Sequence, residues 1–336
     1  RSKIISITGS CGKTTLKEMI GLALNTIFRA TYSPKSFNNK FGVPLSLFNL
    51  KQNDEFGVFE VGMDKKGEID NLTKIIKPDL GIITNISYAH SKNFKNIQQI
   101  ADAKAEIMNN IKKGGIIILN SDDHFFYYHK KKAIKKKLKV ISFGIENKSA
   151  MVKLISTRKK KNKYELLINV NGRSLYFYSK NDNQNNIYNI LASLASINIY
   201  MNIQNLKKDT FLNFKTPAGR GDITKIKFKD KKIYLIDESY NSNPLSLKNA
   251  IENYNKINSQ KSKKYLVLGD MLELGSHSVK QHRLISKVVN KTKINHVYVI
   301  GKYIKETFNG LKFNKKGKIL KKKSDIIDLI NNELIN

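Results

Sequence analysis

The sequence has a single cysteine, Cys11, and no apolar run long enough to cross a membrane. One cysteine cannot build an internal disulfide framework, which favours a reducing compartment, so we expect a cytoplasmic protein. A membrane-spanning helix needs about 18 consecutive apolar residues, and we therefore expect no membrane insertion. No secretory signal is visible either.

Arginine is also scarce. Only six of the 61 basic residues are arginine, although the formal net charge is +34. Proteins that recognise nucleic acids rely on arginine for bidentate hydrogen bonds to bases and phosphates. The lysines are scattered, and the many Lys, Asn and Ile residues all have AT-rich codons, so base composition explains the charge. We expect no nucleic-acid partner and keep nucleic-acid association as a weaker alternative.

A glycine-containing loop follows the first predicted strand, residues 4–8, and leads into a helix predicted over residues 14–28. Backbone N–H groups of such a loop and the helix N-terminus bind phosphate, Lys13 adds a full positive charge, and Thr14 can place its hydroxyl on Mg²⁺. Ile7 stands where the commoner, longer loop has a glycine, so an ordinary strand–helix turn is the alternative. A lysine followed by two threonines favours a nucleoside-triphosphate site. Its expected residues are Thr8, Gly9, Ser10, Cys11, Gly12, Lys13, Thr14 and Thr15.

The first part of the chain alternates apolar strand-like runs with helical patterns. This rhythm predicts an α/β fold with a doubly wound, mostly parallel central sheet built around the phosphate loop. The strands are expected at 4–8, 56–61, 80–84, 115–119 and 139–143, and further helices at 97–111 and 186–200. Between them, short strands at 151–156, 164–170 and 174–178, with Asn171 and Gly172 as a hairpin turn, predict a small antiparallel β excursion.

A proline and two glycines between residues 216 and 221 mark the expected linker. We expect two domains, 1–215 and 216–336, the second a Rossmann-like α/β domain. Its predicted strands are 233–237, 265–269, 296–300 and 318–320, and its predicted helices 244–257, 278–289 and 324–334. The chain begins one residue before a core strand and stops on a helix, so we expect further sequence at both ends.

Two polar residues follow predicted strands of the first domain. Glu60 ends one strand among apolar neighbours, and His90 follows the next. Ligands bind at the carboxyl ends of parallel strands, which groups both residues with the glycine loop as candidate Mg²⁺ ligands. The alternatives are an exposed strand-end glutamate and a structural histidine. Lys104, flanked by alanines on a predicted helix, reads by default as a surface lysine; a buried, CO₂-modified lysine is the other possibility.

Arg220, in the linker, could supply positive charge to a γ-phosphate. Glu238 lies between a strand and a helix, where an acidic residue suits ribose hydroxyls, and Tyr240 could stack on a base. Asn243 before Pro244 offers a structural alternative, because the pair starts a helix well.

With these pieces in order, the chain resembles the Mur ligases, the ATP-dependent amide-forming enzymes of peptidoglycan synthesis, and within them the MurF type. The resemblance runs in family order over most of the chain. It is carried by TGSCGKTT (8–15), NNKFGVPL (38–45), EVGM (60–63), GEI (67–69), TNISYAH (84–90), AKAEI (103–107), NIYN (186–189), GR (219–220), DESYNSN (237–243) and LGDMLELG (268–275), followed by His282.

The resemblance implies an ADP-forming acid–amino-acid ligase with ATP and Mg²⁺, a central ATP-binding domain and a C-terminal domain. It implies that Lys13, His90, Lys104 and Arg220 serve catalysis, with Thr14, Glu60, His90 and a carbamylated Lys104 on metal. Asn186 and Asn189 would contact adenine, Glu238 the ribose and Arg220 the γ-phosphate, while Asn38 and Asn39 would meet the UDP-peptide. Asn185 departs from the family's usual histidine.

The implied reaction joins D-alanyl-D-alanine to UDP-N-acetylmuramoyl-tripeptide through an acyl phosphate, in a monomer. Three alternatives stay open: a sister ligase that adds the third peptide residue, a relative of folylpolyglutamate synthase, and a nucleic-acid-associated P-loop NTPase.

Overall fold

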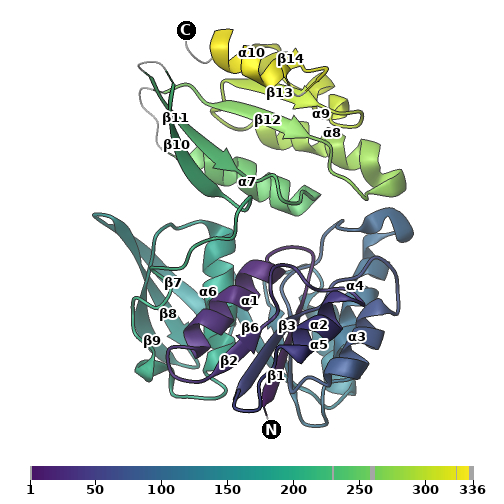
Figure 1. The fold of residues 1–336 in the computed structure, drawn as a ribbon, viewed down its shortest axis with the longest axis vertical. Helices are drawn as coiled ribbons and strands as arrows, with labels where there is room; N and C mark the ends of the chain where they lie inside the picture. The colour runs from purple at the N-terminus through teal and green to yellow at the C-terminus, as the bar shows by residue number, and fades with distance from the viewer. Residues whose placement is uncertain (1, 229–230, 258–261, 323, 333–336) are drawn as a thin grey trace. The chain divides into compact units, whose positions relative to one another are not determined.

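The computed structural model describes residues 2–228, 231–257, 262–322 and 324–332, which form two compact units. Unit 1 comprises residues 1–87 and 93–215, and unit 2 comprises residues 88–92 and 216–336 (Figure 1). The short segment 88–92 therefore groups with the second unit, although it follows a strand of the first.

Unit 1 is built on one nine-stranded sheet with the order β2-β3-β1-β4-β5-β6-β7-β8-β9. From β2 to β7 all neighbours are parallel, and β7, β8 and β9 are antiparallel. The strands are β1 (Lys3–Thr8), β2 (Ala30–Tyr32), β3 (Phe56–Glu60), β4 (Leu80–Ile83), β5 (Ile116–Asn120), β6 (Lys139–Gly144), β7 (Val152–Lys160), β8 (Lys163–Val170) and β9 (Arg173–Ser179). The predicted doubly wound α/β fold is confirmed, and the β excursion extends the same sheet.

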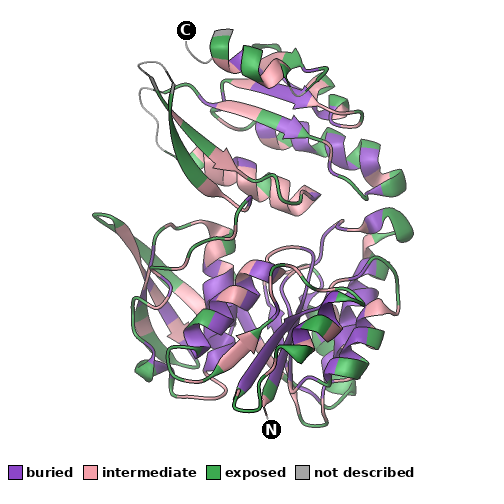
Figure 2. Cartoon of the chain, in the orientation of Figure 1, coloured by how far each residue is buried: buried purple, intermediate pink, exposed green. Residues whose placement is uncertain are grey.

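Helices cover both faces of this sheet. Helices α1 and α6 pack on one face, against Ile5, Ile7 and Ile82, while α3, α4 and α5 lie on the other (Figure 1). Figure 2 shows the central strands buried between these layers, and β3 and β4 are buried along their whole length. The helices of unit 1 are α1 (Lys13–Leu24), α2 (Gly42–Phe48), α3 (Glu68–Ile76), α4 (Ile97–Ala105), α5 (Phe126–Lys135) and α6 (Gln184–Ile197), with short 3₁₀ turns at Glu106–Asn109 and Ile203–Asn205. A further 3₁₀ turn, Ser91–Asn93, lies where the segment 88–92 of unit 2 ends.

Unit 2 contains a parallel three-stranded sheet, β12-β13-β14, and an antiparallel ribbon, β10-β11. Its core gathers around Val297, Val299 and Ile285, which confirms a second α/β domain. The elements are β10 (Asp222–Phe228), β11 (Lys231–Asp237), α7 (Pro244–Lys256), β12 (Tyr265–Gly269), α8 (Ser278–Val289), β13 (His296–Ile300), α9 (Lys305–Asn309), β14 (Lys316–Ile319) and α10 (Asp325–Asn332), with 3₁₀ turns at Gly275–His277 and Phe313–Lys315. The end of the helix expected at 324–334 lies outside the described residues.

Several element boundaries differ from the predictions. The helix expected to reach residue 28 ends at Leu24, and the helix expected over 97–111 changes to a 3₁₀ turn after Ala105. The sequence patterns did not predict α2, α3, α5, α9, β2 or β10. Helix α2 is short and, together with its N-cap residue Phe41, exposes Leu45 and Phe48, so its pattern carries little core signal. Two local predictions are confirmed: Asn171 and Gly172, both at positive φ, form the β8–β9 turn, and Asn243 caps α7 together with Ser246.

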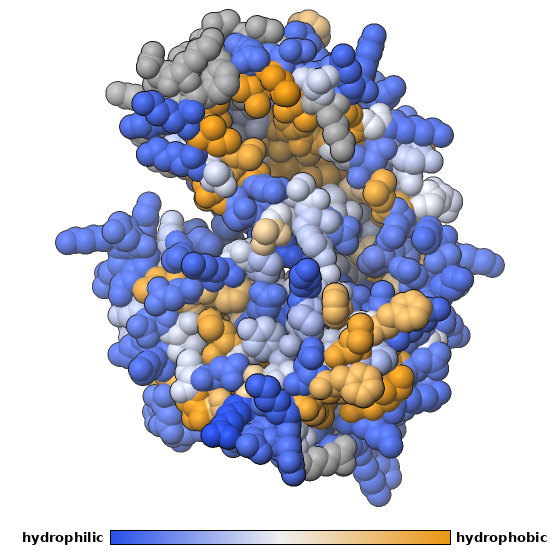
Figure 3. All heavy atoms as spheres, in the orientation of Figure 1, coloured by the Kyte–Doolittle hydropathy of each residue, from blue (hydrophilic) through white to orange (hydrophobic). Residues whose placement is uncertain are grey.

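No described helix is long and apolar enough to serve as a transmembrane span. Hydrophilic side chains cover most of the visible face of unit 1, with an apolar group over α2 (Figure 3).

His129 makes unit 1 sensitive to acid. It lies 2 % exposed on α5, where Nε2–H donates to the Ala101 carbonyl at 3.0 Å, and burial lowers the pKa of the imidazole from 6.5 to about 4. A depressed folded pKa means that the neutral ring stabilises the fold above pH 6.5 and that this stability is lost as pH falls towards 4. We expect the free energy of unfolding to drop by about 3 kcal/mol between pH 7 and pH 4 from this residue.

Urea unfolding at the two pH values measures this drop. His129→Gln should remove most of it, whereas His124→Gln, an exposed histidine just before the same helix, should leave it in place. An unchanged pH dependence in His129→Gln would contradict the assignment.

Candidate nucleotide and metal site

The phosphate loop depends on two glycines at positive φ, Gly9 at 145° and Gly12 at 83°. A Cβ added to Gly9 would collide with the Thr84 side chain and lie 3.1 Å from its backbone nitrogen. A Cβ on Gly12 would lie 3.1 Å from Oδ1 of Asn189. The loop thus packs closely against the end of β4 on one side and against α6 on the other. Gly12 also leads directly into α1, whose first N–H groups face the loop.

Side chains after β4 hold this loop in place. The amide of Asn85 pairs with Cys11 like a backbone group: Oδ1 accepts the Cys11 N–H at 2.9 Å, and Nδ2 donates to the Cys11 carbonyl at 3.2 Å. Thr84 Oγ1 donates to the same carbonyl at 2.6 Å, and Ser10 Oγ accepts the Ser87 N–H at 2.8 Å. From the sequence, only His90 of this stretch was a candidate site residue, and the part of Asn85 and Thr84 in fixing the loop was not predicted; the polar residues directly after a buried strand were the available signal.

Two lysines converge on one carbonyl oxygen in the loop. Lys13 Nζ and Lys104 Nζ each donate to the Gly9 carbonyl at 3.0 Å. Lys104 is only 1 % exposed, so its default reading as a surface lysine is wrong. Desolvation, reinforced by the charge of Lys13, holds the pKa of the Lys104 amine well below its usual range. A lowered pKa favours the neutral form of this buried amine, and the neutral form can react with CO₂, which an ammonium cannot do.

Glu60, at the end of β3, lies opposite the loop and is 1 % exposed. Its Oε2 accepts from Thr14 Oγ1 at 2.7 Å, and its Oε1 accepts from Asn38 Nδ2 at 2.7 Å. A carboxylate and a hydroxyl side by side are hard oxygen donors of the kind that Mg²⁺ prefers, so these residues fit the ion. Neighbouring Asn39 is used differently, because its Oδ1 accepts the N–H groups of Phe41 and Gly42 at the start of α2.

The predicted adenine-binding residues lie on α6. Asn189 is 7 % exposed and, as described above, faces Gly12 of the loop. Asn186 lies one turn earlier and donates to Ser179 Oγ at 2.8 Å. At the start of the loop, the buried Thr8 Oγ1 has no hydrogen-bond partner among the residues that the structure describes. An orphaned hydroxyl at this position is consistent with a site that receives a polar ligand.

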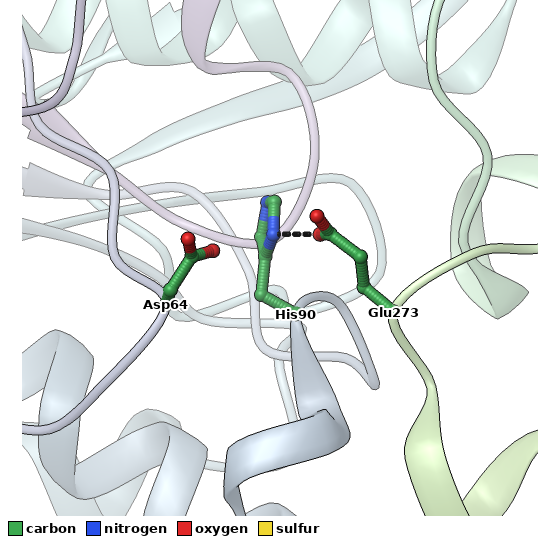
Figure 4. Close-up of side chains that lie close together, drawn as sticks. All are labelled: Asp64, His90 and Glu273. Carbon is green, nitrogen blue, oxygen red and sulfur yellow. Dashed lines mark ion pairs between the residues drawn. The ribbon is translucent and has the colours of Figure 1, made fainter.

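His90 groups with unit 2, where its ring forms an ion pair with the Glu273 carboxylate (Figure 4). The pairing is supported by the backbone, since the Lys92 N–H donates to the Glu273 carbonyl at 2.8 Å and Ser91 Oγ donates to the Leu274 carbonyl at 3.3 Å. The structure therefore gives His90 a partner in unit 2 that the sequence analysis did not foresee. Its role as a metal ligand stays a prediction.

The remaining predicted residues lie together in unit 2. The Arg220 guanidinium carbon lies 4.3 Å from the centre of the Tyr240 ring, a cation–π contact. Gly221 N–H donates to the Asp237 carbonyl at 2.7 Å, which brings the linker residues alongside the end of β11. A Cβ on Gly221 would lie 3.0 Å from Glu238 Oε1, so the carboxylate lies next to the residue that follows Arg220. Their contacts with a nucleotide stay predictions.

Comparison with known proteins identifies two family domains in the chain. The Mur ligase middle domain matches residues 7–197, and the Mur ligase glutamate ligase domain matches residues 220–333. Together these matches cover most of the sequence.

Similar full-length proteins agree with these domains. The UDP-N-acetylmuramoyl-tripeptide–D-alanyl-D-alanine ligase of Bacillus subtilis is 30% identical over 90% of this chain, and the chain spans 63% of that relative's length. The crystal structure of MurF from Acinetobacter baumannii superposes with a TM-score of 0.87 at 25% identity, covering 98% of this chain and 70% of the other. The fold also matches the MurF ligase of Thermotoga maritima solved in complex with ADP, with a TM-score of 0.82 at 24% identity over 98% of this chain and 74% of the other.

Proposed function

The chain belongs to the Mur ligase family, and we propose that it catalyses ATP-dependent addition of D-alanyl-D-alanine to UDP-N-acetylmuramoyl-tripeptide, releasing ADP and phosphate. The B. subtilis relative carries this activity in its name. The strongest support from the structure is one arrangement in unit 1. Thr14 donates a hydrogen bond to Glu60, and Lys13 and Lys104 both donate to the Gly9 carbonyl of the phosphate loop. The single cysteine fits a reducing compartment, and we place the reaction in the cytoplasm.

The chemistry must bring two anions together, the terminal carboxylate of the peptide and the γ-phosphate of ATP. Attack of the carboxylate oxygen on the γ-phosphorus gives an acyl phosphate and ADP; the amine of D-alanyl-D-alanine then attacks the acyl carbon, and phosphate leaves. Lys13 and the loop N–H groups would offset the phosphate charge. Mg²⁺ bound to Thr14 and Glu60 would supply Lewis-acid stabilisation of the phosphate oxygens.

Within this scheme Lys104 has a specific task. Its neutral amine can add to CO₂, forming an N–C bond and releasing one proton, which turns a base into a carbamate anion. A carbamate is an oxygen ligand, so the modified side chain could hold a second Mg²⁺ close to the loop. Burial supports this assignment, because it lowers the pKa of the amine and so favours the neutral form that reacts with CO₂.

The reaction is tested with the purified protein, ATP and Mg²⁺ by measuring inorganic phosphate. Release should require both UDP-N-acetylmuramoyl-tripeptide and D-alanyl-D-alanine, and mass spectrometry should detect the amide product. Release that instead requires a dipeptide precursor plus a third amino acid, or a folate plus glutamate, would assign a sister activity. Absence of release with both proposed substrates would contradict the proposal.

Glu60→Gln tests the metal assignment separately. The amide keeps the size of the side chain but loses the charge that would balance Mg²⁺. We expect the Mg²⁺ concentration for half-maximal ATP binding to rise about 100-fold, in line with the loss of a directly coordinating anion. Glu55→Gln, at an exposed position just before the same strand, should bind Mg²⁺ and ATP like the wild type. A similar Mg²⁺ dependence in Glu60→Gln would remove Glu60 from the metal site.

A further inference from the structure

Lys17 is a fully buried lysine on α1, one turn after Thr14. Burying an ammonium group is costly unless it is paired or hydrogen-bonded. Lys17 Nζ donates to the Lys35 carbonyl at 2.5 Å and lies 3.6 Å from Glu18 Oε1. The buried amino group is therefore anchored to the backbone of a different segment of unit 1, the loop between β2 and α2.

That loop runs along β3 and contacts Glu60 from two sides. Near its start, Ser33 Oγ accepts the Glu60 N–H at 3.2 Å. Near its end, Asn38 Nδ2 donates to Glu60 Oε1 at 2.7 Å, and the Asn38 carbonyl accepts the Gly62 N–H at 2.8 Å. Lys35 lies between these two anchors and has a positive φ of 46°, an uncommon backbone conformation that needs outside support.

We propose that Lys17 is a positioning residue for the metal site, acting through Asn38 on Glu60. Its Nζ donates to the Lys35 carbonyl and fixes it, which keeps Asn38 on Oε1 of Glu60 and leaves Oε2 directed at Thr14. Helix α1 thus contacts Glu60 twice, directly through Thr14 and indirectly through Lys17. This inference rests on the proposed function in one respect, the binding of Mg²⁺ at Thr14 and Glu60.

Lys264, another buried lysine, shows what a purely structural lysine does in this chain. Lys264 donates to the carbonyls of Tyr254, Asn255 and Ile257 at the end of α7, at 2.6 to 3.0 Å. It satisfies the last carbonyls of a helix in unit 2 and touches none of the predicted site residues. Lys264 is therefore the matched control for Lys17.

The test compares Lys17→Met with Lys264→Met in the full chain. Methionine fills a similar volume but donates no hydrogen bond. In Lys17→Met the Mg²⁺ concentration for half-maximal ATP binding should rise about tenfold, the size of one buried hydrogen bond, while ATP binding without Mg²⁺ stays within about twofold of wild type. Amide hydrogen exchange of Gly62, whose N–H is held by Asn38, should be faster in the absence of any ligand. Lys264→Met should lower the unfolding temperature and change neither measurement.

A second variant, Asn38→Ala, tests whether Lys17 acts through Asn38. It should shift the Mg²⁺ dependence like Lys17→Met, and the double variant should show less than the sum of the two effects, because both act on Glu60. Should Lys17→Met fail to fold, Lys17→Gln takes its place. Unchanged Mg²⁺ dependence and unchanged Gly62 exchange in the Lys17 variant would overturn the proposal. If the wild type shows no Mg²⁺-dependent ATP binding, the proposed metal site fails, and Gly62 exchange alone then decides whether Lys17 holds the loop.

Discussion

Lys104→Met is expected to slow amide formation by at least about 100-fold while leaving the protein folded. Methionine keeps the length of the buried chain but can neither take up CO₂ nor bind metal. The size of the effect follows from losing the proposed carbamate, a fully desolvated charge, in a site where charge is the main source of catalysis. Phosphate release under saturating ATP, Mg²⁺ and both substrates measures it.

The same variant should not be less stable, which separates a site effect from a folding defect. In the unmodified protein, burial of the amine opposes protonation, so folding must either strip a proton from Lys104 or bury its charge. The folded pKa lies below the unfolded one, and stability is therefore lost as pH falls below about 10.4. Methionine removes this penalty, and we expect an unfolding temperature at pH 7 equal to or above that of the wild type.

Lys132→Met is the control for Lys104→Met. Lys132 is half-buried on α5 and pairs with Asp102 of α4, the helix that carries Lys104, but does not reach the loop. The turnover rate of Lys132→Met should stay within about threefold of the wild-type rate, as expected for the loss of a partly exposed ion pair. In addition, ¹³C-bicarbonate should give a carbamate resonance in the wild type and in Lys132→Met and none in Lys104→Met. Full activity in Lys104→Met would remove this lysine from the mechanism.

Gly9→Ala is expected to abolish nucleotide binding and to destabilise unit 1 by about 3 kcal/mol. Alanine at φ 145° is strained, and its Cβ would also press on Thr84, whose Cβ lies 3.0 Å away. Relieving that contact would move Thr84 Oγ1 away from the Cys11 carbonyl and so loosen the loop from its support. Isothermal titration with ATP and Mg²⁺, together with urea unfolding, measures the two losses.

Gly114→Ala separates backbone strain from the clash. Gly114 has a φ of 76°, and nothing lies within 4 Å of an added Cβ. This variant should lower the free energy of unfolding by only about 1 kcal/mol and should bind ATP like the wild type. Equal effects of the two substitutions on ATP affinity would mean that the contact with Thr84 does not support the phosphate loop.

The sequence was sufficient to predict the phosphate loop and the alternation of strands and helices, because both are local patterns. It could not reveal that Lys104 is buried, since its helix has the composition of many surface helices, and burial depends on which strands the helix covers. Lys17 was missed for a related reason. Its partner, the Lys35 carbonyl, is a backbone group 18 positions away, and because every residue has a backbone carbonyl, no residue type in the sequence marks this contact. Asn85 was likewise one polar residue among several after a strand, until its two contacts with Cys11 set it apart.

His90 shows the limit of placing residues by strand order. The rule that ligands collect at the carboxyl ends of parallel strands predicts a shared edge, and Thr14 and Glu60 do meet there. The chain leaves that edge after Ser87, however, and residues 88–92 pack with unit 2 through Glu273 and Leu274. A pattern in the sequence does not show where a loop changes its packing partners.

The pairing of β1 also shapes how the chain can fold during synthesis. β1 is made first, but its partners begin at Phe56 and Leu80, whereas β7, β8 and β9 pair through short turns with their immediate neighbours. At typical translation rates, β1 waits roughly 2–10 s for β3 and roughly 4–15 s for β4 to be made. Its apolar residues, among the most deeply buried of the finished domain, have no partner strand until β3 is made and only one until β4 follows. The strand that carries the phosphate loop is thus open to misassociation on the ribosome during this wait, and chaperone protection would matter for it.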